Sequence, residues 1–580
     1  MLQALPELRD LDVDWQEPLT STHLGALGTL TALTSLRVSL ALTLLPLFND
    51  PAPPEDGIGN PPLVLAPPAG MPADLSALTT LTNLRRVAIV FALRLGATTA
   101  AEEPGDRLCA TALLPLMRLP ALCTLHLLRW GSVAGGELVP LLRGLRGRLR
   151  ELAIAGPSML DQLARVDGDA LRAIGACSQL TALRLAVSLP AAAIGRPALA
   201  AWRRDIVAFA EEEAAHRAAA ADRVAAALDT TEAVSALAGL RRLQVAQLEL
   251  HLVYDDADQA PQAGGDERVP VDSFVDGAAG GADLSRRLNG VVLPAWRPTL
   301  CELDLAVSAE VRHGASRRHT AVVFAPPPGC VFERVGVARL DGVSLAPAAL
   351  AALPAVHSLD ISSVTLAIPA PAPSFPPRQP TADQAAAASA ATAAALAPLW
   401  RLRRLHAATR ALCALAPDHA AAAVAAALPH LEALRFIDCH STARAGVLPL
   451  RRLRSLTLTF TDCSAATEPR AARLALRDTV AAMPALQTIQ FTFAEHQYAD
   501  EADVIAWLQA APQLRCLWVK GVQRVTAAVA AAAAAAPALR RVMIAAEGTD
   551  GSLDVAARSQ LQAANPWLSF EVVPVWQWTD

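Results

Sequence analysis

The feature that most constrains this chain is a short apolar frame that recurs along almost its whole length. In the segment LEALRFIDC, residues 431–439, apolar side chains stand at the first, fourth and sixth places. Because alternate residues of a strand face the same side, the fourth and sixth places predict the buried face of a short strand. Fifteen copies follow this frame, at 8–13, 33–38, 84–89, 122–127, 149–154, 180–185, 240–245, 300–305, 356–361, 402–407, 431–436, 453–458, 486–491, 514–519 and 539–544, and residues 332–337 fit it more loosely.

Proline often stands two residues before the frame, as Pro429, Pro484 and Pro512 do. Proline cannot continue a helix and favours an extended residue before it, so each one predicts a switch from helix to strand. The segment VIAWLQAA, residues 504–511, has the helical pattern expected before such a break. One repeat unit is therefore predicted to be a helix, a break and a short strand.

This unit resembles the leucine-rich repeat family, whose core pattern is L-x-x-L-x-L-x-x-N/C-x-L. The resemblance covers the chain from about residue 2 to residue 573, with degenerate copies of the long, helix-containing type. It implies an α/β fold, a leucine-rich-repeat solenoid with a curved parallel sheet on the concave face and helices on the convex face. We expect a single solenoid over residues 1–580, with insertions at 49–74, 198–232, 254–299 and 367–397.

The composition of each insertion predicts a different structure. Residues 49–74 are rich in proline, and residues 198–232 have the pattern of a long helix with Trp202 on its apolar face. Residues 254–299 are acidic and rich in glycine, which predicts a mobile loop. Residues 367–397 pass from a proline tract, expected to be extended, into an alanine tract with helical propensity.

The ninth place of the frame departs from the family pattern. No copy has asparagine there, and only Cys439 conforms. Backbone groups at the turns still need partners, so the sequence predicts a looser and less regular ladder than the family pattern provides. Cys439 follows Asp438 and precedes His440, a combination that could form a reactive thiol or a metal site. The frame instead places Cys439 inward and His440 on the other side, which favours an inert structural thiol.

Catalytic and metal-binding motifs are not supported by the sequence. Lys520, the one lysine of the chain, is followed by Gly521, so it cannot complete a phosphate-binding Gly-Lys-Ser/Thr loop. The alternating acids Asp10, Asp12 and Asp14 have no glycine at the sixth place that a calcium loop requires. We therefore expect no catalytic residues, no metal site and no cofactor.

Composition excludes some classes of partner and favours one compartment. The net charge of −5 at pH 7 argues against a dedicated surface for nucleic acid or anionic membranes, although local patches remain open. The nine cysteines are odd in number, none forms a C-x-x-C pair, and the first residues of the sequence do not resemble a signal peptide. We therefore expect a reduced cytoplasmic protein, with cytoskeletal, axonemal or nuclear sites as alternatives. No stretch of about 20 strongly apolar residues predicts a membrane span.

Outward residues between the buried strand places predict a binding face. The predicted outward residues include both positive and negative side chains: Arg37, His126, Arg184, Gln244, Asp304, Asp360, Arg435, Thr457, Gln490, Trp518 and Met543. The C-terminal copies bring a tryptophan among adaptable polar groups, a composition typical of protein interfaces. The predicted partner-binding residues are Arg435, Thr457, Thr459, Gln490, Thr492, Trp518, Lys520 and Met543. The alternative is that Trp518 is covered by the end of the chain, which carries Trp576 and Trp578.

The hypothesis that follows is a monomeric, non-catalytic scaffold that binds one or more proteins on the concave face, without nucleic acid or membrane partners. A second hypothesis is a substrate-receptor subunit of a ubiquitin ligase. Members of that class carry an N-terminal F-box, and here the repeat begins by residue 2, so this hypothesis requires a missing N-terminal part. A cytoskeletal or axonemal repeat protein is a third possibility, by analogy alone. An enzyme would need converging carboxylates or histidines within 254–330.

Overall fold

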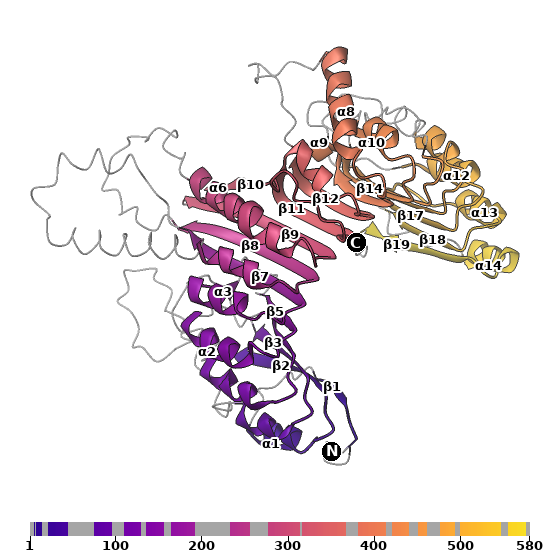
Figure 1. The fold of residues 1–580 in the computed structure, drawn as a ribbon. Coiled ribbons are helices and arrows are strands. Elements are labelled where there is room, and N and C mark those ends of the chain that lie inside the picture. Colours follow the sequence, from indigo (N-terminus) through magenta and orange to yellow (C-terminus); the bar gives the residue numbers. More distant parts are fainter. Residues whose placement is uncertain are drawn as a thin grey trace, which may run out of the picture. The chain divides into compact units, whose positions relative to one another are not determined.

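The chain divides into two compact units, unit 1 over Met1–Pro327 and unit 2 over Pro328–Asp580 (Figure 1). Each is described by itself, and the single solenoid over residues 1–580 stays a prediction. The predicted insertions at 49–74 and, but for its last residue, at 198–232 lie outside the described residues. The computed structural model describes residues 5, 7–13, 21–43, 75–94, 110–128, 135–155, 164–191, 232–255, 277–313, 316–366, 381–412, 420–439, 450–460, 476–493, 499–546 and 555–575.

Unit 1 contains a parallel sheet in which each main strand pairs with the next repeat's strand. These strands are β1 (Asp10–Val13), β2 (Ser35–Thr43), β3 (Arg86–Arg94), β4 (Thr124–Leu128), β5 (Glu151–Ala155), β7 (Ala182–Ala191), β8 (Val245–Asp255) and β9 (Glu302–His313). The two-residue strand β6 (Ala164–Arg165) lies beside β7, and β10 (Ser316–Phe324) is antiparallel to β9. The parallel order requires a crossover after every strand, which the helical half of each repeat supplies.

Short helices of unit 1 lie along one side of its strands (Figure 1). They are α1 (Ser21–Gly28), η2 (Ser76–Thr80), η3 (Ala110–Arg118), α2 (Gly135–Leu145), α3 (Gly168–Gly175), η6 (Val234–Gly239), α6 (Gly277–Arg287), η8 (Leu288–Val292) and α7 (Leu293–Trp296). Neighbouring repeats pack helix against helix, as α2 does against α3 and α3 against η6. Helices thus alternate with strands as the proline breaks predict.

The loop predicted within 254–299 is wrong for residues 277–296, which are helical. Their apolar side chains, including Leu284 and Trp296, are buried despite the glycine-rich start. Two polar side chains also fix this segment to strand β10. The amide of Asn289 donates to the Val323 carbonyl over 2.7 Å, and the Ser285 hydroxyl accepts from the Val323 N–H over 3.0 Å. Composition did not reveal the helix because tertiary contacts of this kind override local propensity.

Unit 2 repeats the same plan. Its strands, each parallel to the next, are β11 (Val337–Leu345), β12 (Ser358–Leu366), β13 (Arg404–Ala408), β14 (Ala433–Cys439), β15 (Ser455–Phe460), β16 (Thr488–Thr492), β17 (Cys516–Val522), β18 (Arg541–Ala546) and β19 (Ser569–Pro574). Its named helices are η9 (Pro347–Ala352), α8 (Ala382–Leu396), α9 (Thr409–Leu412), α10 (Ala420–Ala427), α12 (Glu501–Ala510), α13 (Ala527–Ala535) and α14 (Val555–Ala564). Helix α8 lies in the alanine tract that the sequence predicts as helical.

The core of each unit is built from the apolar places of the frame. In strand β17, Leu517 and Val519 are fully buried, whereas Trp518 between them is half-buried on the other face. A ring cluster fills the space behind strand β16, where Phe491 and Trp507 stand edge to face at 4.8 Å. Burial of each such side chain contributes about 1.5–3 kcal/mol, so the repeated frame accounts for much of the stability. Together, the frame and the parallel register give each unit a leucine-rich-repeat α/β architecture.

The register corrects the frame of two copies. Strand β8 pairs Ala246 with Leu183, so the frame predicted at 240–245 begins three residues later. Strand β11 pairs Ala338 with Leu359, so the frame predicted at 332–337 shifts by the same three residues. Gln244 therefore does not lie on the outward row, because it precedes the strand. Apolar residues recur every third residue before both alanines, which left more than one frame open in the sequence.

The looser ladder predicted from the ninth place is wrong for the long strands of unit 1. Ala41 pairs with Ala92 in an unbroken register between β2 and β3. Ser188 likewise pairs with His251 between β7 and β8. These ninth places lie within strands instead of turns, so ladder hydrogen bonds satisfy their backbone groups and no asparagine is needed. In unit 2 the β14–β15 register does shift between Phe436 and Cys439.

Candidate functional site

The eight residues predicted to bind a partner lie in two adjacent rows of unit 2. Consecutive strands pair Arg435 with Thr457, Thr457 with Gln490, Gln490 with Trp518 and Trp518 with Met543. The second row runs from Thr459 through Thr492 to Lys520. We call these eight residues the strand face of unit 2. Neighbouring strands are about 4.8 Å apart, so the first row extends about 19 Å in four steps. The role of this face in binding stays a prediction.

Trp518 is the largest side chain on the strand face. Its ring is half-buried, and its Nε1–H is shielded from water without a hydrogen-bond partner. The Arg541 guanidinium lies 5.9 Å from the ring centroid, within reach of a cation–π attraction. A buried N–H without a partner costs about 1–3 kcal/mol, so the sheet holds this ring at some expense. The chain end with Trp576 and Trp578, predicted as its alternative cover, lies outside the described residues.

Upstream of Arg435 the same row carries charged groups. Asp360 accepts hydrogen bonds from His406 Nδ1 at 2.9 Å and from the Ser362 N–H at 3.1 Å. Burial by itself raises the pKa of the Asp360 carboxyl, but these hydrogen bonds outweigh it and hold that pKa below its usual range. Arg339 approaches the same carboxylate at 3.9 Å. Arg339 was not among the predicted outward residues because its frame was shifted, whereas His406 could have been found between the fourth and sixth places of 402–407.

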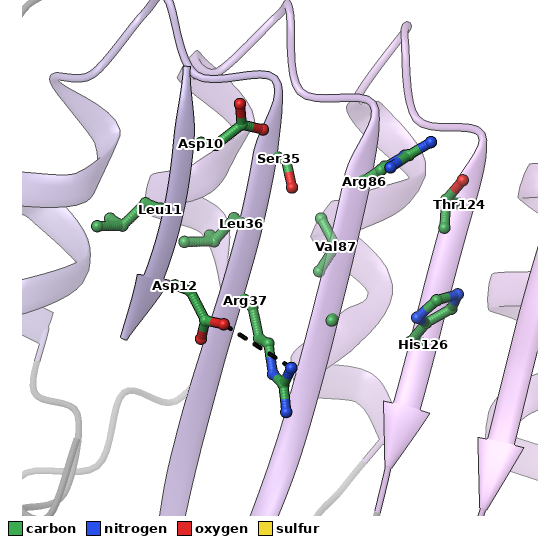
Figure 2. A pocket seen from close by; sticks show the side chains of 11 residues that line it. Asp10, Leu11, Asp12, Ser35, Leu36, Arg37, Arg86, Val87, Thr124 and His126 are labelled. Carbon is green, nitrogen blue, oxygen red and sulfur yellow. Dashed lines mark ion pairs between the residues drawn. The ribbon is translucent and has the colours of Figure 1, made fainter. Parts of the chain in front are cut away.

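Unit 1 has a shallow hollow of about 300 Å³ on the outward side of its first four strands (Figure 2). Figure 2 shows Asp12 and Arg37 directed toward each other, and their charged atoms are 3.7 Å apart. His126 Nε2 lies 3.0 Å from Glu151 Oε1. Ala88 stands between Arg37 and His126 in the same row, and its small side chain leaves the hollow open. Arg37 and His126 thus occupy the outward places that the sequence predicts.

The described residues offer no obvious reactive centre. Within them, no group of three or more histidine, cysteine, aspartate or glutamate side chains could hold a metal ion. In the same residues, no helix is long and apolar enough to cross a membrane. The free thiols there include Cys177, whose burial raises its pKa to about 11. The side chain of Cys439 and the whole of His440 lie outside the described part, so the inert-thiol interpretation of that pair stays a prediction.

Comparison with known proteins gives only distant likenesses. No family model matches the sequence, and no curated protein matches it. The chain is similar to TLR13 in the crystal structure of a TLR13–ssRNA13 complex, at 12% identity and a TM-score of 0.39, covering 99% of this chain and 71% of that one. It is similar to a plant peptide hormone receptor, RGFR1 in complex with RGF2, at 11% identity and a TM-score of 0.28, covering 99% and 80%. The leucine-rich-repeat architecture rests on the chain's own frame and register.

Proposed function

We propose that this chain is a non-catalytic interaction scaffold that binds a partner protein through the strand face of unit 2. The observation that carries the proposal is the pair of registered rows around Trp518. Threonine and glutamine side chains flank the ring and can hydrogen-bond to varied partners, whereas the ring supplies contact area with little rotamer entropy to lose. The strands hold all of these groups in fixed relative positions, which reduces the entropic cost of association.

The sequence also supports a chemical role and a compartment for this scaffold. The absence of a recognised catalytic motif supports a binding role, and the unpaired cysteine pattern supports a reducing compartment such as the cytoplasm. A monomer is the simplest state for a scaffold of this kind. The ubiquitin-ligase and axonemal alternatives stay predictions, because no described residue favours either of them.

The experiment that tests the proposal is affinity capture with the tagged full-length chain, followed by quantitative mass spectrometry. Trp518→Ala and Arg435→Ala are compared with wild type, and Arg477→Ala serves as a control because Arg477 is exposed and outside both rows. Gln490→Arg adds bulk to the face without removing any packing. We expect the captured amount of a specific partner to fall at least tenfold with each of the three face variants and to be unchanged with the control.

Equal capture by wild type and all three face variants would refute the proposed face. Turnover of a substrate by the purified chain would refute the non-catalytic role. Circular dichroism of each variant separates loss of binding from loss of structure, and Gln490→Arg keeps the test decisive if Trp518→Ala is destabilised.

A further inference from the structure

Unit 2 carries a concentration of arginines at the turn that leads into each of several strands. All of these side chains are exposed. We call them the arginine edge: Arg403, Arg404, Arg451, Arg452, Arg454, Arg515, Arg540 and Arg541. The edge is distinct from the strand face, because its residues come before or at the first residue of each strand, whereas the strand face uses later places.

Backbone hydrogen bonds align this edge across the repeats. The N–H of Glu432 donates to the Arg403 carbonyl at 2.8 Å, and the N–H of Arg454 donates to the Glu432 carbonyl at 2.7 Å. The line continues through Gln487 to Arg515, with donations of 2.8 and 2.7 Å. It then reaches Arg540, whose N–H donates to the Arg515 carbonyl at 2.8 Å. Five steps of about 4.8 Å place four arginines on one line of about 24 Å.

Little negative charge opposes these arginines. Glu432 is the one acid on the line from Arg403 to Arg540, and it pairs with Arg403 at 3.4 Å. Within the described part of the chain, Arg451, Arg452, Arg454 and Arg515 form no ion pair. Arg540 Nη1 donates to the backbone carbonyls of Pro537 and Leu539, which leaves its positive charge unneutralised. Arginine presents a planar fork of donors that matches phosphate oxygens in a bidentate way, so arginines without acidic partners along one edge form an anion-binding surface.

Two exposed tryptophans stand at the ends of this edge. Trp400 precedes strand β13 and is 61% exposed, and Trp567 precedes strand β19 and is 78% exposed. The Arg401 guanidinium lies 4.5 Å from the centroid of the Trp400 ring. Two indole rings this exposed contribute little to the core of the unit, so packing does not account for their presence on this edge.

We propose that the arginine edge of unit 2 binds single-stranded nucleic acid. The guanidinium groups contact successive phosphates, and the indole rings of Trp400 and Trp567 stack on unpaired bases. A basic line with aromatic platforms is the combination that single-stranded nucleic acids require. An acidic protein segment would pair with the arginines but would leave both indoles without a role. The net charge of −5 concealed this edge because it averages the whole chain.

The test is fluorescence anisotropy of the full-length chain with labelled 12-nucleotide oligo(U) and oligo(dT), over a range of salt concentrations. We expect micromolar binding at 50 mM salt and a linear fall of log affinity with log salt. The variant Arg451→Gln/Arg454→Gln should lower the salt slope by about 1.4, because each phosphate of a single strand that is no longer neutralised removes about 0.7 from the slope. Trp400→Ala and Trp567→Ala should each weaken binding roughly 5- to 100-fold, as the removal of base stacking does.

Matched controls and a competitor make the proposal falsifiable. Arg477→Gln, exposed outside the edge, should leave affinity and slope unchanged. A difference between the RNA and DNA probes identifies the natural source without affecting the proposal. Absence of binding at 50 mM salt overturns it. So does equal competition by a polyglutamate peptide together with unchanged binding by both tryptophan variants, which assigns the edge to an acidic protein. Variants of the strand face should retain the oligonucleotide, so failure here and failure of the proposed scaffold role are separable.

Discussion

Replacement of glycine by alanine should have opposite effects on stability at Gly25 and at Gly175, both in unit 1. Gly175 ends helix α3, and a Cβ built there would stand 2.2 Å from the backbone oxygen of Ala236 in helix η6. A Cβ on Gly239 would in turn stand 2.5 Å from the Gly175 oxygen, so the two helices meet backbone to backbone. A Cβ on Gly25, inside helix α1, would have no atom of another element within 4 Å.

The magnitudes follow from these distances. Gly25→Ala should stabilise the protein by about 0.5–1 kcal/mol, because alanine loses less backbone entropy than glycine in a helix. Gly175→Ala gains at most the same amount, but the α3–η6 spacing must widen to admit the methyl group. Overpacking of this kind costs about 1–3 kcal/mol, and backbone atoms cannot rotate away. We therefore expect a net destabilisation of about 1–2 kcal/mol for Gly175→Ala.

Urea unfolding followed by circular dichroism measures both differences, and hydrogen exchange at α3 localises the second. Gly25→Ala should raise the unfolding midpoint, and Gly175→Ala should lower it and increase exchange in α3 and η6. If Gly175→Ala proves as stable as wild type, the close backbone contact between neighbouring repeats is wrong, and so is the packing of unit 1 derived from it.

Three further results are expected. Asp360→Asn should lower the free energy of unfolding by about 2 kcal/mol at neutral pH, which is the usual contribution of hydrogen bonds to a charged group. The variant should also lose stability less steeply than wild type as the pH is lowered. The carboxylate's contribution is present above its ordinary pKa of 3.8 and is lost as pH falls through the lower folded pKa. Iodoacetamide at pH 8.5, followed by mass spectrometry, should label half-exposed Cys123 well before Cys177. Cys177 is buried, and its pKa of about 11 keeps the thiol protonated and unreactive. Ala246→Asp should lower the midpoint temperature of thermal unfolding sharply, because it places a carboxylate at a buried position. Gln244→Asp should change that temperature by no more than about a degree or two, because Gln244 is exposed in the corrected frame.

Leucine at the fourth place positioned most repeats correctly from sequence, although Leu243 in the copy at 240–245 did not. Leu456 and Leu517 show the correct placement, each fully buried in a strand that begins one residue earlier. Ala246 and Ala338 could not be placed in this way. Apolar residues at intervals of three precede each alanine, and pairing with the neighbouring strand, a non-local interaction, selects the frame.

The candidate site was predictable to a similar extent. The period-2 rule identified Trp518 and its row neighbours, because each stands between two buried strand places. Neither the orphan Nε1–H of Trp518 nor the hydrogen bond between Asp360 and His406 could follow from spacing alone. Both depend on side-chain conformations that neighbouring repeats determine. The arginine edge was not predicted either, because its members are separated in sequence and aligned only by the backbone ladder.

The most direct test of the proposed scaffold is hydrogen exchange of the full-length chain, alone and bound to the partner obtained by affinity capture. The strand face lies on β14 to β18, so binding there should slow the exchange of backbone amides in these strands, which lie within residues 433–546. Helix α12, whose Trp507 packs behind strand β16, should change little. Protection confined to helices, or to unit 1, would contradict the assignment of the partner to the strand face of unit 2.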